Sequence, residues 1–272
     1  MMNWKQLISA KRFGMEEFHE ERQENRSEFQ RDYDRLIFSA PFRRLQNKTQ
    51  VFPLPGSVFV HNRLTHSLEV ASVGRSLGDD VAKALLERHP ELQDSFLPEI
   101  GSIVSAACLA HDLGNPPFGH SGEKAISTFF SEGKGVRLKE KQPNGEQLSP
   151  MEWEDLTHFE GNANAFRILT HQFEGRRKGG FVLTYTTLAS IVKYPFSSSL
   201  ARTKSKFGFF VSEEESFQKI ATELGLTLLN EHPLKYARHP LVYLVEAADD
   251  ICYQMMDIED AYKLKILTTE ET

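Results

Sequence analysis

Apolar side chains recur every three to five residues along much of the chain, which is the spacing of amphipathic helices. The clearest example is residues 63–89, where leucines and valines follow this interval between polar residues. Residues 102–112 are apolar almost all round, which predicts a central, buried helix. The pattern predicts further helices at residues 122–130, 159–173, 186–194 and 239–266.

Polar connectors rich in glycine or lysine separate these helices, at about residues 131–150, 174–180 and 196–213. Residues 204–211, KSKFGFFV, could form one small hairpin. No internal repeat and no low-complexity tract interrupts the pattern. We therefore expect a mainly α fold, a single-domain helical bundle with long loops.

Composition narrows the class of protein. The 272 residues carry a net charge of −6 with histidines neutral, whereas broad nucleic-acid binding needs a basic surface. The net charge therefore does not indicate single-stranded nucleic acid as an effector, although it does not exclude one. Cys108 and Cys252 lie in apolar segments and are too few for a disulfide framework. No stretch has the roughly 20 apolar residues that span a bilayer, and no secretory signal opens the chain, so we expect a cytoplasmic protein.

The buried helix at 102–112 carries His111 and Asp112 at its inner end. A buried charge is costly unless it is paired or bound to a metal, and a single His–Asp pair closing a helix end is the ordinary explanation. Two other positions change that view: HNRLTH supplies His61 and His66, and Asp249 lies in the middle of the apolar stripe of the last helix. At about 100° per residue, five side chains fall within about 60° of Asp249, namely Val242, Val245, Cys252, Tyr253 and Met256.

Two imidazoles and two carboxylates, from His66, His111, Asp112 and Asp249, make a mixed nitrogen and oxygen site. Such a site suits one divalent metal, and the ligand types alone do not choose among Mn, Mg, Fe, Zn, Co and Ni. A metal-bound water becomes more acidic and can serve hydrolysis. The sequence therefore predicts a catalytic metal centre.

These residues and the blocks around them resemble the deoxyguanosine triphosphate triphosphohydrolase (dGTPase) family of the HD-domain metallohydrolases. The spacing H…HD…D is the superfamily signature, and the blocks that match this branch are RSEFQRDYDRLIFSAPFRRLQNKTQVFP, HNRLTHSLEV, HDLGNPPFGHSGEKAI, LTHFEGNANAFRIL, LASIVKYP and LVEAADDICY. The resemblance runs from about residue 26 to residue 257. Family members are usually longer at the C-terminus, so the single HD-type dNTP triphosphohydrolase domain expected over residues 1–272 could lack a C-terminal helical part.

The resemblance implies metal-dependent hydrolysis of a deoxynucleoside triphosphate, dGTP-like, to deoxynucleoside and inorganic triphosphate, with attack at the α-phosphorus. It also implies that His120 and Glu123, which are three residues apart and can face one way, form the catalytic pair. From the residues alone, Glu123 could instead cap its helix through Ser121. The resemblance further implies a homo-oligomer, a hexamer or a tetramer.

The substrate-binding residues implied by the resemblance are Gln50, Arg63, His158, Lys193, Tyr253 and Asp257. The cations among them would offset the negative triphosphate, and Tyr253 would lie against the sugar. Without the family, Lys193 would be a solvated charge at a helix end and Tyr253 a packing residue. The cations Arg43, Arg44 and Lys48 would serve an effector site or subunit contacts.

Two rival functions stay open. Another HD phosphohydrolase, a phosphodiesterase or a 5′-nucleotidase, would share the four metal ligands but not the blocks around Gln50, His120 and Glu123. A non-catalytic nucleotide-sensing subunit is the second rival, although every ligand and the catalytic pair are present in the sequence.

Overall fold

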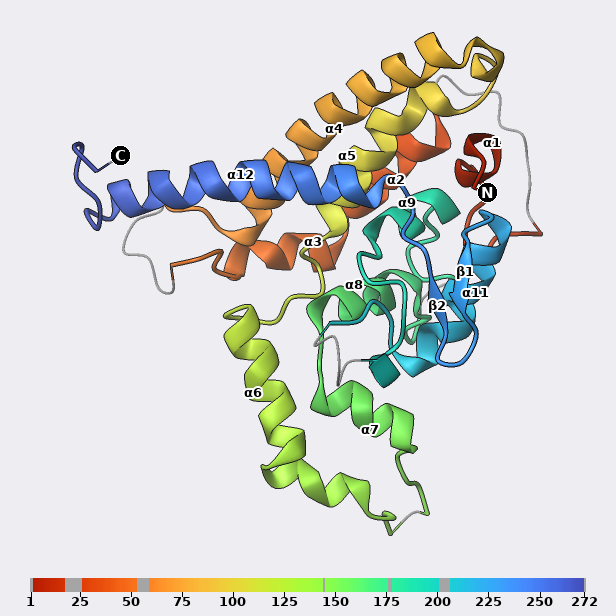
Figure 1. The fold of residues 1–272 in the computed structure, drawn as a ribbon. Coiled ribbons are helices and arrows are strands. Elements are labelled where there is room, and N and C mark those ends of the chain that lie inside the picture. The colour runs from red at the N-terminus through yellow and green to blue at the C-terminus, as the bar shows by residue number, and fades with distance from the viewer. Residues whose placement is uncertain are drawn as a thin grey trace.

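The computed structural model describes residues 2–17, 26–52, 59–143, 145–175, 178–200 and 206–271. The protein is mainly α-helical with one small hairpin, as the sequence predicts (Figure 1). The α-helices are α1 (Trp4–Leu7), α2 (Glu28–Ile37), α3 (Ala40–Arg44), α4 (Arg63–Arg88), α5 (Ile100–Ala110), α6 (His120–Ser131), α7 (Pro150–Thr157), α8 (Gly161–Thr170), α9 (Tyr185–Ile191), α11 (Glu214–Glu223) and α12 (Val242–Lys263). The 3-10 helices are η1 (Leu45–Asn47), η2 (Pro90–Leu92), η3 (Leu97–Glu99), η4 (Lys134–Lys139), η5 (Ser198–Leu200) and η6 (Val211–Glu213). The hairpin strands are β1 (Leu228–Asn230) and β2 (Lys235–Tyr236).

The centre of the molecule is the pair of helices α4 and α5, with α12 packed against both (Figure 1). Every residue of α5 is buried, which confirms the central helix predicted from its apolar sequence. The two helices approach closely because glycines face each other: a Cβ added at Gly78 would lie 2.7 Å from the Cα of Gly101. The long amphipathic helix and the buried helix therefore form one packed unit.

Helix α4 begins where a reciprocal cap satisfies its first backbone N–H groups. The Asn62 side chain accepts hydrogen bonds from the backbone N–H groups of Leu64 and Thr65, both at 3.0 Å. The Thr65 hydroxyl in turn accepts from the Asn62 N–H at 3.1 Å. Such a box stabilises the first turn of a helix. It fixes the two residues of that turn that matter for the site, Arg63 and His66.

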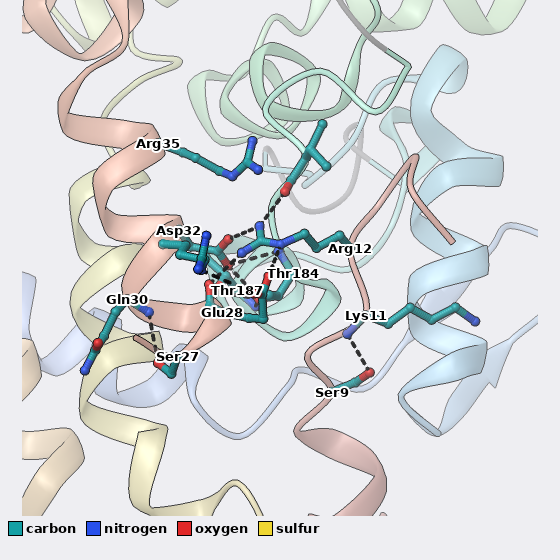
Figure 2. Close-up of polar contacts among 12 residues, drawn as sticks. Ser9, Lys11, Arg12, Ser27, Glu28, Gln30, Asp32, Arg35, Thr184 and Thr187 are labelled. Atoms are coloured by element: carbon teal, nitrogen blue, oxygen red, sulfur yellow. Dashed lines mark hydrogen bonds and ion pairs between the residues drawn. The ribbon is translucent and has the colours of Figure 1, made fainter. Parts of the chain in front are cut away.

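A polar network ties the N-terminal segment to the helical body (Figure 2). Arg12 Nη1 donates to the buried Asp32 of α2 and to the Val182 carbonyl, each at 2.7 Å. Thr184, the N-cap of α9, donates its backbone N–H and its hydroxyl to the other Asp32 oxygen, at 2.9 and 2.6 Å. Both oxygens of this carboxylate therefore have donors, as burial requires. The network joins three segments that are far apart in the sequence.

Helices α6 and α7 form an arm that projects from the body (Figure 1). The short helix η4 lies between them in the chain, so the connector predicted at 131–150 is partly helical rather than all loop. Helix α7 starts at a second reciprocal cap, in which the Ser149 hydroxyl accepts from the Glu152 N–H at 3.2 Å and the Glu152 carboxylate accepts from the Ser149 N–H at 2.7 Å. This cap gives the arm a defined turn.

The hairpin that the described part of the chain contains lies elsewhere than predicted. Strand β1 pairs antiparallel with β2. The predicted position of the hairpin, residues 204–211, was therefore wrong. Residues 204 and 205 lie outside the described part of the chain. In the described remainder, Phe207 and Phe209 are fully buried, and Phe209 makes one isolated parallel bridge with Ser197. The described residues 206–211 therefore form one isolated bridge with residue 197 and no pair of strands.

Both cysteines are free and buried, as predicted. Within the described ranges, no helix has both the length and the apolar character that crossing a membrane requires.

Candidate active site

The four predicted metal ligands converge from α4, the end of α5 and α12. Asp249 Oδ1 lies 3.0 Å from His66 Nε2 and 3.6 Å from His111 Nε2. Asp112 Oδ1 lies 3.6 Å from the same His111 nitrogen. The ligand atoms of His66, His111 and Asp112 all lie within 4.8 Å of one another. We refer to these four residues as the metal cluster.

Helix α12 presents Asp249 within its buried stripe, about 40° from the centre, and not in the middle of the stripe as the sequence predicts. The stripe includes Val245, Ala248 and Cys252, all buried, while 36% of the Asp249 side chain is exposed. The prediction that Tyr253 lies on this stripe was wrong, because Tyr253 is 41% exposed. At about 100° per residue, the centre of the buried residues is close to Val245, and Tyr253 is about 80° away from it. The cluster is therefore buried on one side and open beside Asp249.

The hydrogen bonding of His111 shows which of its nitrogens faces the cluster. Its Nδ1 lies 2.6 Å from the Cys108 carbonyl oxygen, which can only accept, so Nδ1 carries the proton. Its Nε2 is buried and has no hydrogen-bond partner among the described residues. That nitrogen therefore faces the carboxylates of Asp112 and Asp249, which favour a positive charge between them, either a proton on Nε2 or a metal cation that Nε2 binds.

The spacing of the donors also fits a metal. Ligand atoms about 2.1 Å from one ion and about 90–110° apart lie roughly 3.0–3.4 Å from each other. Three donor separations within the metal cluster, 3.0, 3.6 and 3.6 Å, are close to this range, and those among His66, His111 and Asp112 are all within 4.8 Å. Fixing a histidine through its other ring nitrogen, as the Cys108 carbonyl does, is typical of metal ligands. A divalent cation therefore fits these residues.

Charges within the cluster keep its carboxylates ionised. Burial opposes ionisation of Asp249, but His111 and His66 outweigh burial and lower its pKa to about 2. Burial opposes ionisation of Asp112 as well, and His111 and Arg63 lower its pKa. Burial lowers the pKa of His111, while Asp112 and Asp249 raise it more. Ionised oxygen donors beside imidazoles form a donor set for hard and intermediate divalent metals.

Two neighbours orient Asp112. Arg63 Nη1 donates to Asp112 Oδ2 at 2.7 Å, and the Asn115 side chain donates to Oδ1. Arg63 is only 7% exposed, so its guanidinium faces the cluster rather than bulk solvent. Sequence analysis missed Asn115. Its place three residues after Asp112, in HDLGN, is the signal that could have revealed it.

The predicted catalytic pair forms at the start of α6. His120 Nδ1 lies 2.8 Å from Glu123 Oε2, and the Gly161 N–H donates to Glu123 Oε1 at 2.8 Å. Burial opposes ionisation of Glu123, but these two contacts and Lys206 outweigh it and lower its pKa. An ionised Glu123 accepts the Nδ1–H of His120, which leaves Nε2 to exchange a proton. The His120 side chain is 87% exposed, whereas Glu123 is buried beneath it.

The alternative explanation, that Glu123 caps α6 through Ser121, was wrong. The N-cap residue is Gly119, no side chain caps the helix, and the Glu123 carboxylate contacts His120 and Gly161 instead. Gly119 has a φ of +53°, and a Cβ there would lie 2.9 Å from Arg63 Nη2. The glycine therefore lets the start of α6 lie against Arg63, which links the His–Glu pair to the metal cluster.

Two residues that sequence analysis did not single out surround the pair. Lys206 Nζ lies 2.9 Å from Glu160 Oε2 and 3.4 Å from Glu123 Oε2. Glu160 also caps α8 by accepting from the Asn162 N–H at 3.3 Å. Lys206 follows Glu123 by 83 residues, so no local spacing could have revealed the contact. Glu160 belongs to the HFEG block, which was the available signal for it.

The structure places the predicted phosphate-binding residues in different surroundings. Lys193 Nζ lies 2.7 Å from Glu246 Oε1, and its charge helps to lower the pKa of Asp249. Lys193 therefore lies close to the metal cluster. His158 contacts its own helix, with Nδ1 at 3.1 Å from the Glu154 carbonyl oxygen and 3.4 Å from Glu154 Oε2.

The remaining predicted residues lie around the cluster or away from it. Gln50 is half-buried, and its Oε1 has no hydrogen-bond partner within the described ranges. Burial, with the charge of Asp260, raises the pKa of Asp257 on α12. His61 is bound elsewhere: its Nδ1 lies 2.8 Å from Asp260 Oδ1, and its N–H donates to Oδ2 at 2.9 Å. Of the two histidines of HNRLTH, only His66 belongs to the metal cluster.

Comparison with known proteins bears directly on this geometry, because the HD domain family matches residues 63–179. This chain carries an HD domain. Deoxyguanosinetriphosphate triphosphohydrolase-like proteins of Synechocystis sp. and Pseudomonas aeruginosa are each 46% identical to it, over 98% and 99% of the chain and 61% and 59% of their own lengths. The deoxyguanosinetriphosphate triphosphohydrolase of Yersinia enterocolitica is 36% identical, over 99% of the chain and 57% of its own length. The predicted resemblance is confirmed.

The chain spans about three fifths of the length of these relatives. The HD domain match includes His66, His111, Asp112 and the His120–Glu123 pair, but it ends before Asp249. Asp249 therefore reaches the cluster from α12, a helix that lies outside the HD domain match and inside the segment shared with the relatives.

Proposed function

We propose that this HD-domain chain hydrolyses deoxynucleoside triphosphates, dGTP-like substrates among them, to deoxynucleoside and inorganic triphosphate. The observation that carries the proposal is the convergence of four metal-binding side chains beside an oriented His–Glu pair. An HD domain and relatives named for dGTP triphosphohydrolysis support a phosphohydrolase. The substrate class and the products are what we add.

One divalent metal, which could be Mn, Mg, Fe, Zn, Co or Ni, would be held by His66, His111, Asp112 and Asp249, where it would acidify a water and polarise a phosphoryl oxygen. His111 offers the unpartnered Nε2, and the two aspartates offer ionised oxygens. Arg63 donates to Asp112 Oδ2, while Oδ1 is the oxygen near His111. The exposed side of Asp249 leaves an approach for the substrate.

His120 and Glu123 would control the proton of the leaving group. Glu123 holds the Nδ1–H of His120, so Nε2 is the atom that takes or gives a proton. Water adds to the α-phosphorus, and the bond between that phosphorus and the 5′ oxygen breaks. The 5′ oxygen receives a proton and leaves as the hydroxyl of the deoxynucleoside. A positioned acid or base at this step is worth about 10²–10⁴ in rate.

The substrate would lie between the cluster and the arm. Cations at Arg63 and Lys193, with His158, would balance the charge of the triphosphate. Gln50, Tyr253 and Asp257 would contact the deoxyribose, with Asp257 accepting from the 3′-hydroxyl. We also infer a homo-oligomer from the family resemblance, and the cytoplasmic location stays a prediction.

Product analysis tests this function. The chain is incubated with dGTP and Mn²⁺, and ³¹P NMR with ion-exchange chromatography identifies the products. Our proposal predicts inorganic triphosphate and deoxyguanosine in equal amounts, and none from an Asp249→Ala variant. Monophosphate or free orthophosphate would indicate another HD phosphohydrolase. Tight dGTP binding without any product would indicate a nucleotide-sensing subunit.

A further inference from the structure

Lys48 differs from the other cations of its segment, FRRLQNKTQ. Arg43 and Arg44 are exposed, whereas Lys48 is half-buried and turned inward. Its Nζ donates to the Asn115 carbonyl at 2.6 Å and to the Leu113 carbonyl at 3.4 Å. We expected Lys48 to serve an effector site or subunit contacts, but its ammonium binds carbonyl groups inside its own chain.

The backbone of Lys48 is bound to the start of α4. Its carbonyl oxygen accepts from the Arg63 N–H at 3.0 Å, and the next residue, Thr49, forms an antiparallel bridge with Asn62. Asn62 caps the turn that carries Arg63 and His66. Lys48 thus contacts the helix of one metal ligand through its backbone, and the turn after two others through its ammonium.

The ammonium replaces donors that the chain cannot supply. A carbonyl in a helical turn accepts from the N–H three or four residues later. For Leu113 these positions are Pro116 and Pro117, which have no N–H. The side chain of Lys48 donates to this carbonyl instead. Without it, a carbonyl of a buried residue would lose its donor, which is unfavourable because a buried acceptor without a partner is not compensated by water.

The turn that Lys48 binds is the turn that orients Asp112. The Asn115 N–H donates to the Asp112 carbonyl at 3.2 Å, and the Asn115 side chain donates to Asp112 Oδ1. Burial, together with the nearby charges of Arg63 and Arg44, lowers the pKa of Lys48, while Asp112 opposes that change. The ammonium of Lys48 stays close to Arg63 although the two positive charges repel each other. Its contacts with the two carbonyls therefore fix its position.

We propose that Lys48 is a positioning residue for the metal centre: its ammonium joins the turn at residues 113–115 to the start of α4 and so holds Asp112 in place relative to His66 and His111. This inference rests on the proposed function, because it requires the metal cluster to bind a cation. Lys48 itself touches neither the metal ligands nor, in this role, the substrate.

The test is the Mn²⁺ affinity of the whole chain, measured by EPR of free Mn²⁺ with thermal unfolding recorded in parallel. Lys48→Met keeps the aliphatic stem and removes the donor, and we expect it to weaken Mn²⁺ binding about 10–100-fold, as loss of outer contacts to metal ligands typically does. Lys48→Arg keeps a cation with several donors and should recover most of the affinity. Arg44→Met removes a neighbouring positive charge from an exposed position and should bind Mn²⁺ like the wild type.

Wild-type Mn²⁺ affinity in folded Lys48→Met, even with a lower melting temperature, overturns the inference. Should Lys48→Met not fold, Lys48→Leu also removes the donor and leaves a shorter apolar side chain, and wild-type Mn²⁺ affinity in that folded variant overturns the inference equally. A wild type that binds Mn²⁺ but releases no triphosphate contradicts the proposed function alone. A wild type that binds no Mn²⁺ contradicts both.

Discussion

Two residues of the metal cluster, His111 and Asp112, and the His120–Glu123 pair lie at the two ends of one short segment, residues 111–123, yet the fold holds the cluster and the pair by different means. The cluster comes from three packed helices, with His66 and Asp112 only 1% and 5% exposed. The pair stands at the base of the projecting arm, with His120 exposed and Glu123 held by contacts from Gly161 and Lys206. Core packing therefore sets the ligands, whereas a few polar contacts set the pair. We expect metal binding to survive loss of the pair.

Asp249→Ala should have the largest effect. It removes the only cluster residue that α12 supplies and leaves two imidazoles beside one carboxylate. Loss of outer contacts alone weakens metal affinity about 10–100-fold, so loss of a ligand should exceed that and abolish turnover. Asp250→Ala, at the adjacent exposed position, is the control. Elemental analysis showing full metal content in Asp249→Ala would remove Asp249 from the cluster.

His120→Ala should separate the two regions. The rate should fall about 10²–10⁴-fold, while metal content and nucleotide affinity stay at the wild-type level, because the side chain is exposed and contacts no metal ligand. Single-turnover kinetics with elemental analysis measures both. Ser121→Ala, an exposed neighbour on the same turn, should be active. Metal loss in His120→Ala would mean that the two regions are not independent.

The body that supports the cluster should lose stability in mild acid through His239. Burial lowers the pKa of His239 to about 4, and its Nε2 contacts the Leu7 carbonyl at 3.1 Å. The unfolded chain, with an ordinary value near 6.5, binds the proton first, so stability is full above pH 6.5 and falls as the pH drops toward 4. At 1.36 kcal/mol per unit, the loss is about 3 kcal/mol.

His239→Gln, which keeps a donor to Leu7, should reduce that pH dependence by the same amount. Urea unfolding at several pH values between 4 and 7 measures the difference between variant and wild type. Parallel curves over this range would show that His239 does not carry the effect.

Gly119→Ala should disturb the junction between the two regions. The φ of +53° strains any other residue, at about 1–3 kcal/mol, and the new Cβ would lie 2.9 Å from Arg63 Nη2. Because Arg63 contacts Asp112, we expect kcat/KM to fall roughly tenfold. That factor is a loss of about 1.4 kcal/mol of transition-state stabilisation. Gly145→Ala is the matched control, since its φ is +88° and nothing lies within 4 Å of its Cβ. Equal activity losses in both variants would assign the effect to backbone strain alone.

Tyr253→Ala should have the smallest effect. An added 2′-hydroxyl of a ribonucleotide would lose hydration against this ring without a partner. Because Tyr253 is 41% exposed, we take the lower end of that cost, about 1 kcal/mol, or about fivefold in selectivity. The ratio of kcat/KM for dGTP and GTP should narrow by that factor. An unchanged ratio would place Tyr253 outside the sugar site.

Much of the helical core follows from the sequence because each of those helices has a long apolar face. The periodicity predicts α4 and α5 nearly to their ends, and α5 has no exposed residue. The pattern did not predict α2, a helix with five charged residues among ten, which buries Asp32 together with Phe29 and Leu36 because Asp32 pairs with Arg12, 20 residues away. The hairpin was misplaced for a similar reason, because tertiary burial of Phe207 overrides the local strand pattern.

The candidate site divides in the same way. His66, the His111–Asp112 pair and Asp249 are predictable because a motif or a helical face marks each of them. The supporting contacts of Lys48 and Lys206 are not, because each joins residues more than 40 positions apart. Such contacts depend on how helices pack, which no local spacing encodes.

The most direct test of the central claim is a crystal structure of the chain soaked with Mn²⁺, recorded for anomalous scattering. Our account predicts one strong peak about 2.2 Å from a nitrogen of each histidine of the metal cluster and an oxygen of each of its aspartates. A peak bound by other residues, or no peak at saturating Mn²⁺, would contradict the metal centre and the hydrolysis that depends on it.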